Sequence, residues 1–283
     1  MEVRKMSKEL VNALLPERCA NTHKGDYGKV LLLCGSVGYT GAAALAAMGA
    51  LRAGAGLVYL GVPESIYAIE AVKLLEPIVM PLKGRNGMLS ADAIEKIAGL
   101  IERMDAVLIG PGLGTSDGTY AVVRWVLENF NGPVVVDADG INVLKSHKDV
   151  LRGRTSPTIL TPHEGEFQRI GGKLCDGRIS GTVKLAKDLG AVIVLKGHDT
   201  VITDGMTAYL NPTGNPGMAV GGSGDVLAGI LVGLLGQKLA PPLEAAACAA
   251  WLHGAAGDIC AEEIGQYGML PSDMLRVLPR LLK

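Results

Sequence analysis

The chain has 283 residues, 48% of them apolar, and a formal net charge of −1, which argues against a disordered chain and against electrostatic attraction to nucleic acid. Its longest apolar stretches, 42–51 and 226–236, are shorter than the about 20 residues that a membrane-spanning helix needs. Residues 1–15 carry charges and no long apolar core, which argues against a secretory signal. We therefore expect a soluble cytoplasmic protein that binds neither nucleic acid nor membranes.

Short β-rich runs alternate with helical patterns along the chain. Apolar runs predict strands at 30–34, 57–62, 106–109, 134–137, 158–160, 192–195, 201–203 and 207–210. Helical patterns lie between or after them, at 41–53, 91–102, 120–129, 181–189, 225–235 and 243–262. This alternation predicts one α/β domain, residues 1–283, with a mostly parallel sheet covered by helices on both faces. The runs 200–203 and 207–210 predict a hairpin that places antiparallel strands at one edge.

The five cysteines are odd in number and contain no CxxC pair. A disulfide framework and a zinc cage are therefore not expected, and the cysteines are interpreted as small apolar core residues. Glycine, in contrast, is abundant: its 39 residues are about twice the usual share, whereas only 4% of the chain is aromatic. Because glycine loses more backbone entropy on folding than other residues do, this excess needs a local cause.

Ligands of open α/β sheets bind beyond the carboxyl ends of the strands, and two glycine-rich loops follow predicted strands. The first, 35–41, has the spacing GxxGxxG instead of the GxGxxG of a dinucleotide fingerprint. A Rossmann dehydrogenase turn, a plain strand-to-helix turn and a ligand-binding turn of another fold all remain open. The second, 110–114, contains three glycines, which either let the backbone approach a ligand closely or form a bare loop.

Polar residues follow three further predicted strands. Asp137 and Asp139 suit Mg²⁺ or a hydroxyl-bearing ligand, or one of them caps a helix. In 161–167, Pro162 fits a first helical turn, and His163 is either a ligand contact or a structural histidine. The segment 196–200, with a lysine and a glycine directly after a strand, suits a phosphate or an adenosine, or is an ordinary turn.

The most informative segment is 221–225, Gly-Gly-Ser-Gly-Asp, at the start of a long apolar helix. Free amides and the positive end of the helix make this segment an anion site. Asp225 beside that site would take a proton from a hydroxyl that attacks phosphorus, which we favour over a simple N-cap role. The chain contains no P-loop, no GxSxG nucleophile elbow and no HExxH motif.

Seven motifs in this order closely resemble the ADP/ATP-dependent NAD(P)H-hydrate dehydratase family of the ribokinase-like superfamily. They lie at 23–28, 35–43, 110–114, 137–142, 161–167, 196–200 and 221–229. The resemblance runs from about residue 15 to the C-terminus. It implies a ribokinase-like, three-layer α/β/α fold with antiparallel edge strands. The epimerase domain fused to many relatives would not fit in this length.

The resemblance also implies a function. The enzyme would be a hydro-lyase of metabolite repair that dehydrates the S epimer of NADH or NADPH hydrated at C6, driven by hydrolysis of ADP to AMP, or of ATP to ADP, with release of phosphate. Matching positions imply contacts to the hydrated cofactor from Ala42, Gly112, His163 and Asp225. They imply contacts to the adenine nucleotide from Lys196, Gly197, His198, Asp199, Thr200 and Gly224.

In this reaction Asp225 would take the proton of the C6 hydroxyl as that oxygen attacks the terminal phosphorus. The anion hole would be formed by Gly221, Gly222, Ser223 and Gly224. Mg²⁺ would bridge oxygens of the phosphoryl donor, with Asn142, Glu164 and Glu166 as candidate ligands.

Other functions remain to be weighed against this one. A vitamin-precursor kinase of the same superfamily would share the Asp225 loop but would leave the motifs at 23–28 and at His163 unexplained. A nucleotide-sensing protein without catalysis would not need the intact 221–225 segment. Relatives imply a homo-oligomer, such as a tetramer, that acts with a separate epimerase.

Overall fold

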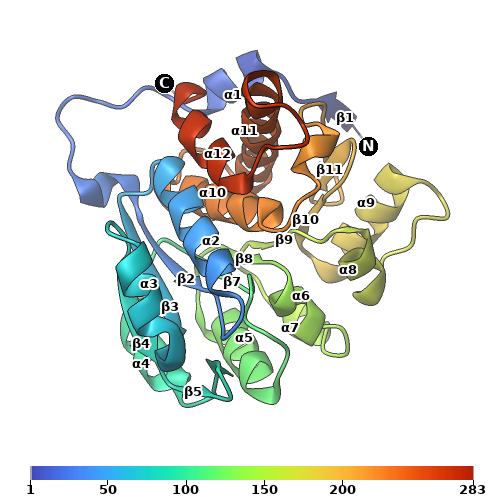
Figure 1. Ribbon diagram of the computed structural model, residues 1–283. Helices are drawn as coiled ribbons and strands as arrows, with labels where there is room; N and C mark the ends of the chain where they lie inside the picture. The colour runs from blue at the N-terminus through green and yellow to red at the C-terminus, as the bar shows by residue number, and fades with distance from the viewer. Residues whose placement is uncertain (1, 283) are drawn as a thin grey trace.

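One continuous sheet runs through the molecule, which the computed structural model describes over residues 2–282 (Figure 1). Neighbouring strands pair in parallel except around β11, which runs antiparallel to both β10 and β12. A separate short hairpin consists of β5 (Gly84–Arg85) and β6 (Met88–Leu89). In spatial order the strands of the main sheet are β1 (Glu2–Lys5), β12 (Thr207–Asn211), β11 (Thr200–Thr203), β10 (Val192–Leu195), β9 (Thr158–Leu160), β8 (Val134–Val136), β7 (Ala106–Ile109), β2 (Lys29–Leu33), β3 (Leu57–Pro63) and β4 (Ile78–Leu82).

Helices cover both faces of this sheet (Figure 1). On one face lie α1 (Lys8–Leu14), α2 (Thr40–Arg52), α10 (Ser223–Gln237), α11 (Pro242–Glu263) and α12 (Pro271–Val277). On the other face lie α4 (Ala93–Ile101), α5 (Asp117–Asn129), α7 (Asp149–Arg152) and α9 (Arg178–Leu189). Three further short helices are α3 (Tyr67–Lys73) beside β4, α6 (Asp139–Val143) after β8 and α8 (Glu164–Arg169) after β9.

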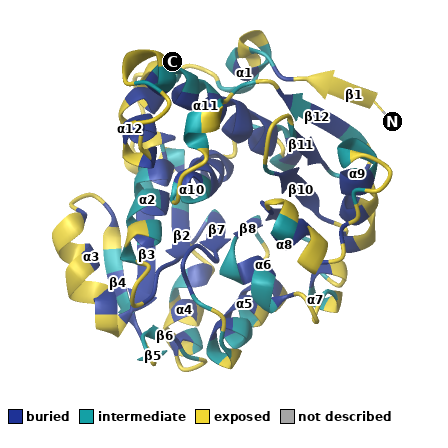
Figure 2. Ribbon diagram, turned by 45° about the vertical axis from the view of Figure 1, so that its right-hand side comes forward, coloured by how far each residue is buried: buried dark blue, intermediate teal, exposed yellow. Residues whose placement is uncertain are grey.

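Two hydrophobic cores form because side chains alternate along each buried strand. Val30 and Leu32 of β2 join the core under α2, α10 and α11, whereas Leu31 and Leu33 join the core under α4, α5 and α9. Figure 2 shows the central strands and α10 buried, with α3 and β1 largely exposed. The predicted α/β/α layering and mostly parallel sheet are therefore confirmed.

The predicted strands and helices are all present, with boundary shifts of a few residues. The hairpin of β11 and β12 is also confirmed, but its predicted place at the edge is wrong, because β1 pairs with β12 and takes the edge. Strand β1 was not predicted, since its four residues are all exposed and form no apolar run. Strand β4 at the opposite edge was also missed. Over residues 2–282, no helix is both long and apolar enough to cross a membrane.

The helices α2 and α10 pack backbone against backbone. A Cβ atom on Gly229 of α10 would collide with the carbonyl oxygen of Ala46, and one on Gly49 of α2 would lie 2.8 Å from the carbonyl oxygen of Val226. Ala43, Ala46, Ala47 and Ala50 fill the rest of this contact and are fully buried. The many buried residues of α2 and α11 show that these two Ala-rich helices are core elements.

Replacing Gly229 with Ala should therefore destabilise the protein by about 1–3 kcal/mol, because the added methyl group forces α2 and α10 apart. Thermal unfolding followed by circular dichroism measures this loss. Gly99→Ala is the matched control, since nothing lies within 4 Å of a Cβ at that exposed position of α4. The control should gain up to about 1 kcal/mol from helix propensity, and an equal loss in both variants would contradict the packing argument.

Candidate active site

A cavity of about 810 Å³ opens where the loops after β8, β9 and β10 leave the carboxyl edge of the sheet. These loops form one wall, residues 211–219 after β12 form the second, and the start of α10 with part of α11 forms the third. The predicted residues that line it are Asp137, His163, Glu166, Lys196, Gly197, His198, Asp199, Thr200, Ser223, Gly224 and Asp225. The structure thus brings the predicted nucleotide-binding segment 196–200 and the Asp225 loop to one cavity.

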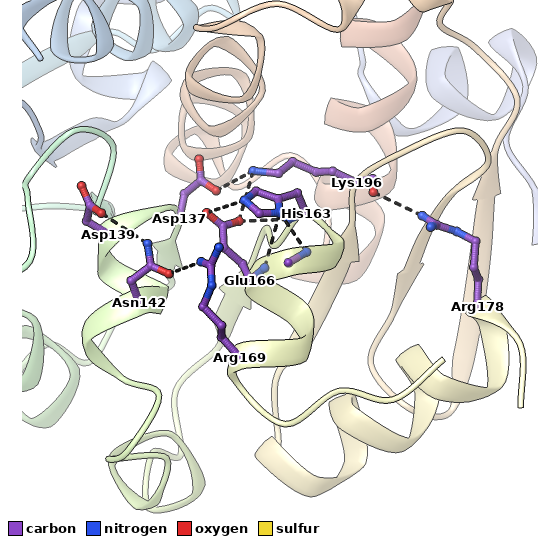
Figure 3. Close-up of polar contacts among 9 residues, drawn as sticks. Asp137, Asp139, Asn142, His163, Glu166, Arg169, Arg178 and Lys196 are labelled. Atoms are coloured by element: carbon purple, nitrogen blue, oxygen red, sulfur yellow. Dashed lines mark hydrogen bonds and ion pairs between the residues drawn. The ribbon is translucent and has the colours of Figure 1, made fainter. Parts of the chain in front are cut away.

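Lys196 lies between two buried carboxylates in this cavity (Figure 3). Its Nζ donates to Asp137 Oδ1 at 2.8 Å and lies 3.9 Å from Glu166 Oε2. Burial alone would lower the pKa of Lys196, but the charges of Asp137, Glu166 and Asp225 outweigh it and raise the pKa. Lys196 is therefore a permanent cation, which suits an anionic ligand.

Arg178 fixes the backbone at Lys196. Its Nη2 donates to the carbonyl oxygens of Leu195 and Lys196, both at 3.2 Å, and its Nη1 pairs with Glu164. The turn between β10 and β11 is thereby anchored to α9 and to the start of α8.

Asp225 has the most strongly altered acidity of the carboxylates in the cavity. Burial, with the nearby charges of Asp137 and Asp139, raises the pKa of Asp225 to about 7, although Lys196 acts in the opposite direction. A carboxylate with such a pKa can take up and release a proton near neutral pH, as a general base requires.

The anion site predicted at 221–225 is formed by the start of α10. This helix begins at Ser223, two residues earlier than expected, because Gly222 takes the N-cap position with φ of +98°. Within residues 2–282, the amides of Gly224 and Asp225 have no hydrogen-bond acceptor. They are therefore available to an anion, and a Cβ on Gly224 would lie 3.3 Å from Lys196 Nζ. Gly221 and Gly222 stand outside the cavity lining.

His163 caps α8, which is a structural role, and it also lines the cavity, so its contact with a ligand stays a prediction. Its Nδ1 accepts from the amides of Gly165 and Glu166, at 3.0 and 3.4 Å, while Glu166 Oε2 accepts from the His163 amide at 2.9 Å. The helix starts at Glu164, so Pro162 precedes it and the predicted place of Pro162 in the first turn is wrong. Glu164 and Glu166 occupy that turn, as expected from the helix dipole.

The three candidate magnesium ligands do not converge on one point. Asn142 Oδ1 accepts from Arg169 at 2.5 Å (Figure 3). Glu164 pairs with Arg178 and does not line the cavity. Only Glu166 of the three lines the cavity, opposite Asp137. In the described part of the chain, no three His, Cys, Asp or Glu side chains form a group that could hold a metal ion.

Asp139 stabilises a loop and does not cap a helix. Its Oδ2 accepts from the Gly114 amide at 2.9 Å, and its Oδ1 accepts from Asn142 at 3.3 Å. The N-cap of α6 is Ala138, so the alternative that one of the two aspartates caps this helix is wrong.

Ala42 and Gly112 are neighbours in space, although 70 positions separate them in the sequence. A Cβ on Gly112 would lie 3.0 Å from Cβ of Ala42, and Ser36 Oγ donates to the Gly112 carbonyl at 2.7 Å. The two glycine-rich loops therefore form one unit at the carboxyl edge, but neither Ala42 nor Gly112 belongs to the lining of the main cavity. The motif at 23–28 lies at the opposite edge, ahead of β2.

The sequence arguments missed polar residues on two walls of the cavity. These are Asn211 at the end of β12, Thr213 and Asn215 after it, and His253 on α11. His253 lies in a helix that reads as plain apolar core, so its only sequence signal was a histidine in an Ala-rich segment. All five cysteines are free thiols; Cys34, Cys248 and Cys260 are buried core residues, whereas Cys19 and Cys175 are exposed, so the core interpretation is wrong for these two.

Comparisons with known proteins place this geometry in context. The family model described as NAD(P)H-hydrate dehydratase matches residues 30–280. The chain is 46% identical to the bifunctional NAD(P)H-hydrate repair enzyme Nnr of Moorella thermoacetica over 276 residues, which cover 95% of this chain and 52% of that protein. The chain thus spans about half the length of the curated relatives it matches first.

A second relative is matched over its full length. The ADP-dependent (S)-NAD(P)H-hydrate dehydratase of Bacillus subtilis is 38% identical, with 100% of this chain and 99% of that protein covered. A solved structure of the Bacillus subtilis enzyme, co-crystallised with ATP/Mg²⁺, superimposes with a TM-score of 0.85, 36% identity and coverage of 99% and 98%. A ribokinase-like superfamily protein of Enterococcus faecalis gives a TM-score of 0.87 at 28% identity, with coverage of 98% and 94%. The expected ribokinase-like fold is confirmed.

Two glycines at the start of α10 should respond to substitution in opposite ways. Gly222→Ala should lower the free energy of unfolding by about 1–2 kcal/mol, because alanine is strained at positive φ and its methyl would lie 2.6 Å from Leu45 Cδ1. Gly224→Ala should leave the melting temperature unchanged or raise it, yet weaken ADP binding, because its methyl lies beside Lys196. Differential scanning fluorimetry and titration calorimetry test both, and unchanged ADP affinity in Gly224→Ala would contradict the anion site.

Asp225 should make folding stability depend on pH. Its pKa is about 7 in the folded protein and about 4 in an unfolded chain, so stability falls as pH rises from 4 to 7. The free energy of unfolding of Asp225→Asn should therefore exceed that of the parent by up to about 4 kcal/mol at pH 8 and show no gain near pH 4. Urea unfolding at both pH values measures this, with exposed Asp149→Asn as the control. A gain of equal size at both pH values would contradict the raised pKa.

Proposed function

The chain belongs to the NAD(P)H-hydrate dehydratase family, and we propose that it dehydrates the S epimer of hydrated NADH or NADPH, driven by ADP or ATP. One observation carries the proposal most directly, namely a carboxylate of pKa about 7 at the open amides of α10, inside a cavity that also holds a cationic lysine. This arrangement suits transfer of a phosphoryl group to a hydroxyl, which turns a poor leaving group into a good one.

The reaction begins with the hydroxyl at C6 of the hydrated nicotinamide ring. Asp225 takes its proton while the oxygen forms a bond to the terminal phosphorus of ADP, and the bond from that phosphorus to the rest of the nucleotide breaks, giving AMP. The amides of Gly224 and Asp225 hold the charge that develops on the phosphoryl group. The phosphate ester then leaves with its C–O electron pair, assisted by the ring nitrogen, and loss of a proton from the adjacent carbon restores the double bond.

The nucleotide has its own part of the cavity in this proposal. Residues 196–200 form its wall, and Lys196 offers a cation to the phosphates. Asp137 and Glu166 are two of the carboxylates that line this cavity, and Mg²⁺ usually keeps one or two carboxylates plus substrate phosphates, so they fit a magnesium ion better than Asn142 or Glu164, which do not line it. When bound, Mg²⁺ would neutralise phosphate charge.

The hydrated cofactor would approach from the side of the two joined glycine-rich loops. Ala42 and Gly112 lie next to each other there, and His163 and Asp225 line the cavity. This placement puts the nicotinamide end near Asp225 and leaves the rest of the dinucleotide along the carboxyl edge of the sheet.

Several further properties follow from the family membership as proposals. Residues 1–283 form one dehydratase domain that assembles as a homo-oligomer, namely a tetramer. Its curated bifunctional relatives are named as repair enzymes with more than one activity, which supports cooperation with a separate epimerase. The cytoplasmic location stays a prediction from the sequence.

The test is an assay of the purified protein with hydrated NADH and either ADP or ATP, in which the absorbance of reduced nicotinamide returns. Asp225→Asn should lose about 10²- to 10⁴-fold in turnover while it still binds nucleotide, because only the proton acceptor is removed. No recovery with either nucleotide would refute the proposed function, and a stable phosphorylated product would indicate a kinase instead.

The same assay has a pH dependence fixed by Asp225. The base must be ionised, so kcat/KM should rise about tenfold per pH unit below pH 7 and level off above it. Initial rates at low substrate between pH 5 and 9 measure the profile. A rate that stays constant from pH 5 to 7 would show that another group takes the proton.

A further inference from the structure

His253 is a buried histidine of α11 that lines the cavity next to the start of α10. Its Nε2 lies 3.3 Å from Oγ of Ser223, the first residue of α10, and both side chains line the cavity while remaining less than 10% exposed. Ser223 is directly followed by Gly224 and Asp225, whose amides face the phosphoryl group in the proposed reaction. His253 therefore touches the anion site through a serine hydroxyl and not through its own charge.

The helix that carries His253 is fastened to the opposite wall of the cavity. Asn211 Nδ2 donates to the carbonyl oxygen of Ala250 at 3.1 Å, Thr213 Oγ1 donates to that of Trp251 at 3.0 Å, and the Gly214 amide donates to Asp258 Oδ2 at 2.9 Å. These three hydrogen bonds fix α11 at residues before and after His253, and none of them involves a ligand.

His253 is neutral at physiological pH. Burial, as the main cause, and the positive charge of Lys196 lower the pKa of His253 to about 4, although a hydrogen bond to the Ser223 backbone acts in the opposite direction. A neutral imidazole has one N–H donor and one bare nitrogen acceptor, and its tautomer decides which of the two faces a neighbour. His253 therefore does not act as a cation that neutralises phosphate charge.

The two tautomers have opposite consequences for Ser223. If Nε2 is bare, the Ser223 hydroxyl donates to it and turns lone pairs toward the anion, which repels a phosphoryl group. If Nε2 carries the proton, it donates to Ser223 Oγ and leaves the hydroxyl proton free for the anion. A bound phosphoryl group selects the second arrangement because it accepts the serine proton in a charge-assisted hydrogen bond.

We propose that His253 is a positioning residue whose Nε2–H donates to Ser223 Oγ and so directs the Ser223 hydroxyl proton to the transferred phosphoryl group. This inference rests on the proposed function, because the phosphoryl group is the one that the dehydratase reaction transfers. The serine hydroxyl then adds a third donor to the two free amides at the start of α10. No proton is transferred along this pair, and both bonds serve orientation.

Kinetics of four variants test the role. His253→Leu and Ser223→Ala should each lower kcat by about 10- to 100-fold, with the KM for hydrated NADH unchanged, because the donor acts on the charge that develops during transfer. The double variant should lose no more than either single variant, since both remove the same donor. His253→Gln, which can place an amide donor near the Nε2 position, should recover part of the rate. Exposed His147→Leu, outside the cavity lining, is the matched control and should keep full activity.

A kcat of His253→Leu equal to the parent value, or multiplicative losses in the double variant, would overturn the proposal. These outcomes presuppose an active parent enzyme, so a parent without turnover refutes the proposed function and not this hydrogen bond. The bond is then tested independently by nitrogen-15 NMR of histidine-labelled protein with ADP and Mg²⁺, in which His253 is assigned by its loss in His253→Gln. The neutral Nε2–H tautomer supports the proposal, and the Nδ1–H tautomer overturns it.

Discussion

The close contact between the backbones of α2 and α10 is the constraint on which the site depends. Gly49 and Gly229 allow the two helices to touch, and no larger residue fits at Gly229 without a collision with Ala46. The helices run from the same carboxyl edge of the sheet, so their separation sets how far Ala42 lies from Asp225. A change in this packing would therefore alter the distance between Ala42, on the proposed substrate side, and Asp225, the proposed base.

A second constraint is electrostatic, and it acts through one cation. Asp137, Glu166 and Asp225 bring three carboxylates to one buried region, and Lys196 is the cation that lies between them. The lysine holds Asp137 and Glu166 in ion pairs, yet its attraction does not offset the burial of Asp225, so Asp225 keeps a pKa of about 7. Buried charges of this kind are expensive unless paired, which explains why Arg178 and the His163 cap fix the surrounding loops.

Much of the site could be predicted because its groups are local in the sequence. The segments 196–200 and 221–225 each combine a strand or helix end with glycines, and such ends expose amides wherever they occur. The magnesium ligands could not be predicted in this way. Whether Glu164 or Glu166 faces the cavity depends on Arg178 of α9 and on the His163 cap, and the sequence spacing of the two acids does not reveal these partners.

By itself the sequence determined the order of the central strands and helices and the mostly parallel sheet, and it singled out segment 221–225 and Asp225, which the proposed function makes the anion site and the base, since these follow from periodicity and from short motifs. The tertiary structure alone decided the edge position of β1, the joining of the Ala42 and Gly112 loops, the elevated pKa of Asp225 and the contact of His253 with Ser223. The physical reason is that each of these depends on residues 30 or more positions apart, whose approach is set by the packing of whole elements and by the water this packing excludes.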